Sequence, residues 1–172
     1  MDAADHYRRL VALGREGFLA AAPHAVLVRY RSDDVPLDAI TGGDTMTLED
    51  ETMDETMPRG RPEMNEVELD VFPLVKKPGA SFPDRITIGR TSNNDIVISD
   101  HSISRLHAYV RGHDLTWVVA DAGSKNGSWL RGEALEPRRE KPLPSRAVLR
   151  LGDVDVTFYW ASDLYIVLGG MP

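Results

Sequence analysis

Short apolar segments alternate with polar turns over most of the chain. Apolar residues at every second position indicate β-strands, and clusters of Gly, Asn, Asp, Ser and Pro indicate the turns between them. The pattern predicts strands at residues 67–76, 86–88, 96–98, 106–111, 115–121, 128–130, 148–151, 154–160 and 164–168. Many short strands without intervening helical segments predict a mainly β protein with an antiparallel β-sandwich over residues 66–172.

Residues 1–31 have a different pattern. Apolar residues at helical spacing predict one helix from Asp5 to about Ala21, and Ala25–Tyr30 predicts one strand. A single helix and a single strand cannot bury their apolar faces alone. We therefore expect this appendage to dock on the sandwich; the alternative is a detached, disordered arm.

Residues 32–65 lack any apolar periodicity. Within them, residues 44–57 contain six acidic residues, four threonines and no basic residue. Few apolar groups and charge of one sign cannot compensate the entropy lost on ordering, so this composition predicts a flexible acidic linker. A Glu-Thr-Met triplet occurs twice, which makes Thr52 and Thr56 the candidate phosphoacceptors. The alternative is a solvated tether with no further role.

Composition and charge narrow the functional class. The chain of 172 residues has no cysteine, so it has no disulfide and no thiolate metal site, as expected for a cytoplasmic protein. Residues 1–65 hold 7 Lys and Arg against 13 Asp and Glu and carry −6 of the net charge of −7. This acidity argues against nucleic acid or an anionic membrane as partner. No apolar run approaches the ~20 residues that span a membrane.

Five polar residues that suit one ligand fall in three predicted turns: Arg90, Ser104, Arg105, Lys125 and Asn126. Loops at one end of a sandwich converge, so these side chains could share a small surface. Cations, a hydroxyl and an amide together suit a phosphate dianion, because Arg donates two parallel hydrogen bonds and Lys supplies a point charge. The pattern therefore indicates a binding site for a phosphorylated ligand that needs no cofactor.

Three motifs in this order, Gly89-Arg90, Ser104-Arg105-Leu106-His107 and Ser124-Lys125-Asn126-Gly127, lie on an all-β pattern. Together they resemble the forkhead-associated (FHA) domain, and the resemblance covers roughly Val67 to Leu168. It implies an FHA-type β-sandwich that binds phosphothreonine in proteins. In outline the chain also resembles small bacterial FHA regulators that carry an N-terminal phosphoacceptor threonine.

The resemblance implies a role for each motif residue. Arg90 and Ser104 match the positions that hold the phosphate, and Arg105 and Lys125 match positions that add phosphate or backbone contacts. Asn126 matches the residue that hydrogen-bonds the peptide main chain. Positions that support the binding loops from beneath are matched by Gly89, His107 and Gly127.

Catalysis and metal binding are weaker alternatives. A hydrolase triad would combine Ser104 and His107 with Asp100 or Asp121. A Ser and a His three residues apart across a turn rarely face one another, and the chain has no Gly-x-Ser-x-Gly motif. The three histidines of residues 101–113 are six apart, which is no metal-ligand spacing. We expect neither enzymatic activity nor a bound metal.

The resulting hypothesis is a non-catalytic adaptor that binds phosphothreonine in proteins modified by a Ser/Thr kinase. A refinement is self-regulation, in which phosphorylated Thr52 or Thr56 enters the Arg90 site and displaces outside partners. The alternative is a scaffold or assembly protein that binds partners through the sheet face of the FHA domain and ignores phosphate.

Overall fold

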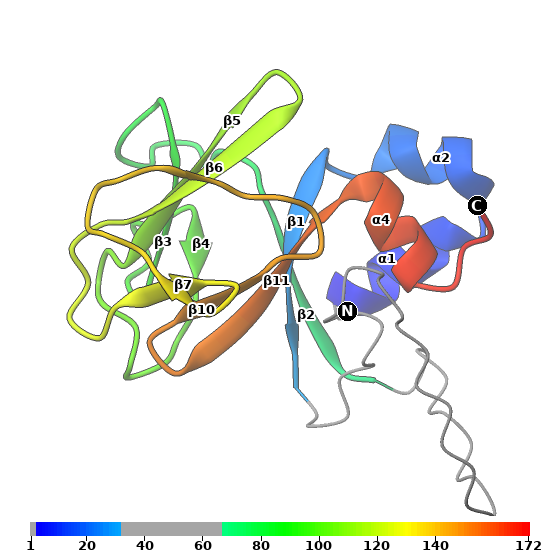
Figure 1. Ribbon diagram of the computed structural model, residues 1–172. Helices are drawn as coiled ribbons and strands as arrows, with labels where there is room; N and C mark the ends of the chain where they lie inside the picture. Colours follow the sequence, from blue (N-terminus) through cyan, green and yellow to red (C-terminus); the bar gives the residue numbers. More distant parts are fainter. Residues whose placement is uncertain (1–2, 32–66) are drawn as a thin grey trace, which may run out of the picture.

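The computed structural model describes residues 3–31 and 67–172 and contains two β-sheets packed as a sandwich (Figure 1). The first sheet contains β1 (Ala25–Tyr30), β2 (Leu69–Pro73), β7 (Ser128–Leu130), β8 (Glu133–Ala134), β10 (Val148–Leu151) and β11 (Val154–Trp160). The second contains β3 (Ile86–Gly89), β4 (Ile96–Val97), β5 (Ala108–His113), β6 (Thr116–Asp121) and β9 (Lys141–Pro142). Their orders are β2-β1-β11-β10-β7-β8 and β4-β3-β5-β6-β9.

Strand alternation places the main core between the two sheets. In β11, Val156 and Phe158 face this core, whereas Tyr159 points to the opposite side of the sheet. Leu27 and Ile88 supply fully buried side chains from β1 and β3. Pairing is antiparallel between the strands that the structure describes, except that β3 and β4 run parallel. The mainly β sandwich expected from the apolar pattern is confirmed.

Three helices cover the outer face of β2, β1 and β11 (Figure 1): α1 (Ala3–Val11), α2 (Gly14–Ala21) and α4 (Ala161–Val167). Phe18 of α2 is fully buried, and its ring centre lies 5.4 Å from that of Tyr165 in α4. The hydroxyls of Tyr30 and Tyr159 share a hydrogen bond of 2.6 Å between β1 and β11. A second apolar cluster therefore fills the space between the helices and this half of the sheet.

β1 is an inner strand of the first sheet. Val28 pairs with Thr157 of β11 on one side and with Val71 of β2 on the other. The stretch from 32 to 66, which contains the predicted linker with Thr52 and Thr56, lies outside the described residues and connects two neighbouring strands. Within the described part of the chain, no helix is long and apolar enough to cross a membrane.

Two predicted elements differ from the structure. The single helix expected up to Ala21 is broken at residues 12–13, directly before Gly14, whose φ of 75° is incompatible with a continuous α-helix. The strand expected at residues 164–168 was wrong, because this stretch belongs mostly to α4. This apolar run is too short for its periodicity to distinguish a strand from a helix. As a helix, it buries its apolar side chains against the outer face of β1 and β11.

Candidate functional site

Three loops meet at one end of the sandwich. They follow β3, join β4 to β5, and join β6 to β7. The backbone N–H of Arg90 donates to the carbonyl of Ser104 at 3.0 Å, and the backbone N–H of Lys125 donates to the Ser104 hydroxyl at 3.0 Å. β6 and β7 belong to different sheets, so the turn at Asn126 crosses between sheets and does not close a hairpin.

The loops enclose a surface depression of about 900 Å³, which we call the phosphate depression. All five residues expected to contact a phosphorylated ligand line it: Arg90, Ser104, Arg105, Lys125 and Asn126. No Asp or Glu is among the described residues that line it. Three cationic side chains in a lining without carboxylates favour an anionic ligand.

Arg90 and Ser104 keep donors for such a ligand. The Nε of Arg90 donates to the carbonyl of Ile103 at 3.1 Å, which uses one of the five N–H donors of the guanidinium. The Ser104 hydroxyl accepts the Lys125 N–H, which leaves its own O–H able to donate. A guanidinium held at one nitrogen beside a hydroxyl donor is suited to an oxyanion.

Asn126 and the two glycines have structural constraints of their own. The Asn126 side-chain amide donates to the carbonyl of Ser102 at 2.8 Å, which orients the amide on the β4–β5 loop. A Cβ on Gly89 would lie 2.1 Å from the carbonyl oxygen of Arg105, so no larger residue fits there. Gly127 has a φ of 85°, a conformation that residues with a side chain rarely adopt.

His107 is fully buried beneath the loops. Its Nδ1 accepts the backbone N–H of Ser104 at 3.0 Å, so the ring proton lies on Nε2 and donates to the carbonyl of Gly127 at 2.9 Å. Burial lowers the pKa of this histidine, which favours the neutral ring. Both ring nitrogens are therefore engaged with backbone groups, and His107 cannot serve as the base for Ser104 in a hydrolase triad.

Asp121 supports the β6–β7 loop, a role that the motif pattern did not predict. Its carboxylate accepts the backbone N–H groups of Gly123 and Ser124 at 2.7 and 2.8 Å and the Ser128 hydroxyl at 2.6 Å. Burial alone would raise the pKa of Asp121, but these hydrogen bonds and that of the Ser124 hydroxyl together lower it below the usual range. The sequence signal was an Asp at the start of a Gly-Ser turn, where side chains bond the backbone.

Asn94 supports the loop after β3 and the β4–β5 loop in the same way, through side-chain hydrogen bonds to the backbone. Its buried side-chain amide donates to the carbonyls of Thr91 and Arg105 at 2.9 and 2.6 Å. The loop that carries Arg90 is thereby tied to the loop that carries Ser104. In the described residues, no three His, Cys, Asp or Glu side chains gather as a metal site requires.

Comparison with known proteins gives a family match inside the sandwich. Residues 86–152, which include every motif residue of the three loops, match the FHA domain family. An FHA domain-containing protein of Arabidopsis thaliana is 36% identical over 78 residues, which are 45% of this chain and 19% of that protein. The oxoglutarate dehydrogenase inhibitor of Corynebacterium diphtheriae is 35% identical over 72 residues, which are 42% of this chain and 48% of that protein.

The match therefore spans half or less of these curated relatives. Among solved structures, EmbR of Mycobacterium tuberculosis in complex with a low-affinity phosphopeptide is 28% identical, with 45% of this chain and 20% of that chain covered and a TM-score of 0.41. Residues 86–152 match the FHA family and also supply the motif residues that line the phosphate depression. The chain carries a forkhead-associated domain at residues 86–152.

Proposed function

We propose that the phosphate depression binds phosphothreonine in a partner protein modified by a Ser/Thr kinase, and that the protein acts as a non-catalytic adaptor. The observation that carries the proposal is the group of three cations and one hydroxyl donor in a depression without carboxylates. Hydrogen bonds to charged groups contribute roughly 1.5–3 kcal/mol each. Two or three of them suffice for micromolar peptide affinity once the costs of association are subtracted.

In this proposal each residue has the role that the family resemblance implies. Arg90 and Ser104 hold the phosphate, Arg105 and Lys125 add positive charge, and Asn126 hydrogen-bonds the main chain of the peptide. The family match supports this assignment, since all five residues lie within the matched segment. A regulatory role without catalysis also agrees with the name of the corynebacterial relatives, which describes an inhibitor.

The test is a titration of the full chain with a fluorescent peptide of residues 49–61 carrying phosphate on Thr52 or Thr56, and with the unmodified peptide. Arg90→Ala should weaken phosphopeptide binding at least tenfold, because a charge-assisted contact to the phosphate is lost. Arg15→Ala is the matched control, since it removes the same charge from an exposed position in α2.

A degenerate phosphothreonine library extends the test to ligands from other proteins. If neither the peptides nor the library bind in a manner that depends on Arg90, the proposed function is wrong. A natural partner that binds the Arg90→Ala chain with unchanged affinity would support the phosphate-independent scaffold.

The self-regulation hypothesis extends the same site. β1 runs antiparallel to β11, so the end of β1 at Tyr30 lies near the turn where β10 leads into β11. Arg31 and Val67, the described residues on either side of 32–66, therefore lie on the side of the β10–β11 turn, where the backbone N–H of Asp153 donates to the Ser102 hydroxyl at the phosphate depression. The composition of residues 32–65 predicts a flexible tether, and such a tether would give an effective concentration on the order of millimolar, so a weak internal ligand could compete with outside partners.

Kinase treatment of the full chain, compared with a chain carrying Thr52→Ala and Thr56→Ala, tests this extension. Phosphorylation should weaken binding of an outside phosphopeptide in the unaltered chain alone. If the kinase labels neither threonine, self-regulation is excluded while phosphothreonine binding stands.

A further inference from the structure

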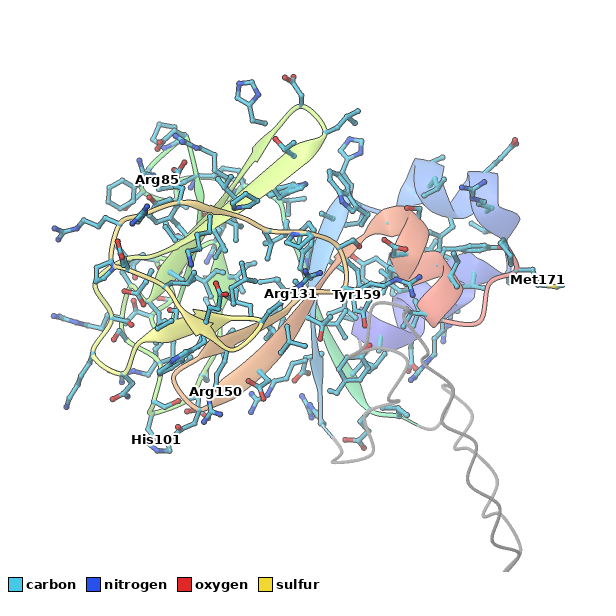
Figure 2. The ribbon with its side chains drawn as sticks, viewed as in Figure 1. Arg85, His101, Arg131, Arg150, Tyr159 and Met171 are labelled. Carbon is cyan, nitrogen blue, oxygen red and sulfur yellow. The ribbon has the colours of Figure 1, made fainter. Side chains whose placement is uncertain are left out.

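A second depression, which we call the sheet-face pocket, lies on the outer face of the second sheet. It measures about 290 Å³, and side chains of β3, β5 and the neighbouring loops line it: Phe82, Arg85, Thr87, Leu106, Tyr109, Ala122 and Arg138. Thr87 and Tyr109 are cross-strand partners whose sequence neighbours face the core, so these two side chains point outward. Arg85, labelled in Figure 2, lies far from the helices and from Met171.

The sheet-face pocket adjoins the phosphate depression. Leu106 lines both depressions and is 37% exposed. It directly follows Arg105, one of the three cations of the phosphate depression. On the other side, Ala122 of the sheet-face pocket is followed by Gly123, which lines the phosphate depression. An extended peptide with its phosphate beside Arg105 can therefore place a neighbouring side chain in the sheet-face pocket.

Aromatic rings form much of the wall of the sheet-face pocket. The Arg85 guanidinium lies 4.5 Å from the centre of the Tyr109 ring and 5.6 Å from that of the Phe82 ring. Its charge is paired with Asp84, to which it donates two hydrogen bonds of 2.7 and 3.1 Å. No Asp or Glu is among the described residues that line the pocket. Ring faces and a flat, already paired guanidinium favour another aromatic ring as the ligand group.

Two residues of the sheet-face pocket have a backbone conformation that side chains disfavour. Phe82 and Arg138 both have a φ of 62°, in the left-handed region. For a bulky residue such as Phe82 this conformation is rare and costs free energy. The Phe82 ring is nevertheless 48% exposed, so its burial in the folded chain offsets little of that cost. Strained positions of this kind occur at sites that contact a ligand.

Arg138 adds a positive charge at the rim of the sheet-face pocket. Its backbone N–H donates to the carbonyl of Asp121 at 2.7 Å, which holds this loop against the end of β6. Its side chain is exposed, and within the described part of the chain the guanidinium has no ion-pair or hydrogen-bond partner. A guanidinium in this position can lie over the face of a bound aromatic ring.

We propose that the sheet-face pocket takes an aromatic side chain of the partner protein, close in sequence to the phosphothreonine in the phosphate depression. This inference rests on the proposed function and adds a sequence preference to it. A cavity of about 150 Å³ holds benzene in another protein, so the larger sheet-face pocket has room for one aromatic ring. The outer face of the second sheet then selects among phosphothreonine proteins, whereas the loops recognise the phosphate.

The test is a titration of the full chain with short fluorescent peptides that carry phosphothreonine at the centre of an alanine and glutamine background. In each peptide of the series, phenylalanine replaces one background residue, on either side of the phosphothreonine; the parent peptide has none. At one or two adjacent positions on a single side, phenylalanine should tighten binding about three- to tenfold, the gain expected when a ring is partly buried in an open pocket.

Two protein variants should reduce this gain. Phe82→Gly removes the ring and should abolish the gain; glycine also suits the φ of 62°, so the variant should fold. Arg138→Asn removes the charge at the rim and should abolish part of the gain, and Asn tolerates the same conformation. The controls are Leu115→Ala, at an 86% exposed position on the β5–β6 hairpin, and Arg131→Asn, at an exposed position with a φ of 51°. Both controls should keep the full gain.

Absence of a gain at every position would overturn the inference, and so would a gain that survives Phe82→Gly. A phenylalanine peptide that binds equally well without its phosphate would also overturn it, because the pocket would then act independently of the phosphate depression. If Arg90→Ala weakens the parent peptide while phenylalanine has no effect, only the sheet-face pocket is assigned wrongly. If no peptide of the series binds, the inference is wrong, and the proposed function then depends on the phosphothreonine library.

Discussion

The loop end of the sandwich and its helix-covered face are stabilised by opposite means. Beneath the loops, buried polar groups have specific hydrogen-bond partners, as His107 has in Ser104 and Gly127. Under the helices, the buried groups are mainly apolar, with Phe18 and Leu164 among the fully buried side chains. A polar network depends on residue identity, whereas an apolar cluster depends chiefly on volume. The candidate site therefore lies in the region where residue identity is constrained.

Phe18→Ala tests this contrast with the largest expected effect. It should lower the free energy of unfolding by about 3–5 kcal/mol, because a buried aromatic ring is replaced by a cavity. Affinity of the folded protein for phosphopeptide should stay the same, since α2 lies away from the loops. Urea denaturation and a peptide titration measure the two quantities. Leu19→Ala, at a neighbouring and 39% exposed position, is the control and should have a small effect on stability.

A loss of phosphopeptide affinity in folded Phe18→Ala would contradict the separation of the two regions. The helices would then influence the loops through β1 and β11.

His107→Ala tests the loop end. The substitution leaves the N–H of Ser104 and the carbonyl of Gly127 without their buried partner and should cost about 2–4 kcal/mol of stability. It should also weaken phosphopeptide binding, because Ser104 and the β6–β7 loop lose a common support. The same two measurements apply, with exposed His113→Ala as the control. Unchanged affinity would show that the loops hold their arrangement without the histidine.

The pH dependence of the free energy of unfolding tests the contribution of the polar loop end, with a smaller expected effect. Burial lowers the pKa of His107 in the folded protein. Below about pH 6.5, this histidine therefore binds a proton in the unfolded chain but stays neutral in the folded one. The stabilisation is complete above pH 6.5 and decreases as the pH falls from 6.5 toward the folded pKa, by at most about 1.4 kcal/mol per pH unit. The Asp121 carboxylate near the ring opposes this effect in part.

Urea denaturation between pH 7.5 and 5 measures this decrease. His107→Gln should flatten the dependence in that range, because no ionisable group remains at the position. An equally steep dependence in the variant would assign the effect to other groups.

Local sequence determined most of the strands and the chemistry of the loops. Alternating apolar residues located the two hairpins β5–β6 and β10–β11, because a strand with one buried face repeats at every second residue. The three motifs supplied five side chains suited to phosphate, and the structure brings all five to one depression. Their contacts with phosphate remain predictions.

Tertiary structure decided what depends on distant neighbours. The apolar run after Trp160 forms a helix because a helix there buries its apolar side chains against the outer face of β1 and β11. Asp121 became a buried support because Ser128 and Gly123 surround its carboxylate. The depression lined by Trp129, Arg150 and Asp155 arises only when β7, β10 and β11 lie side by side. The pattern of polar and apolar residues in one segment shows which of its side chains are buried. A binding site, by contrast, depends on which distant segments come together in the folded chain.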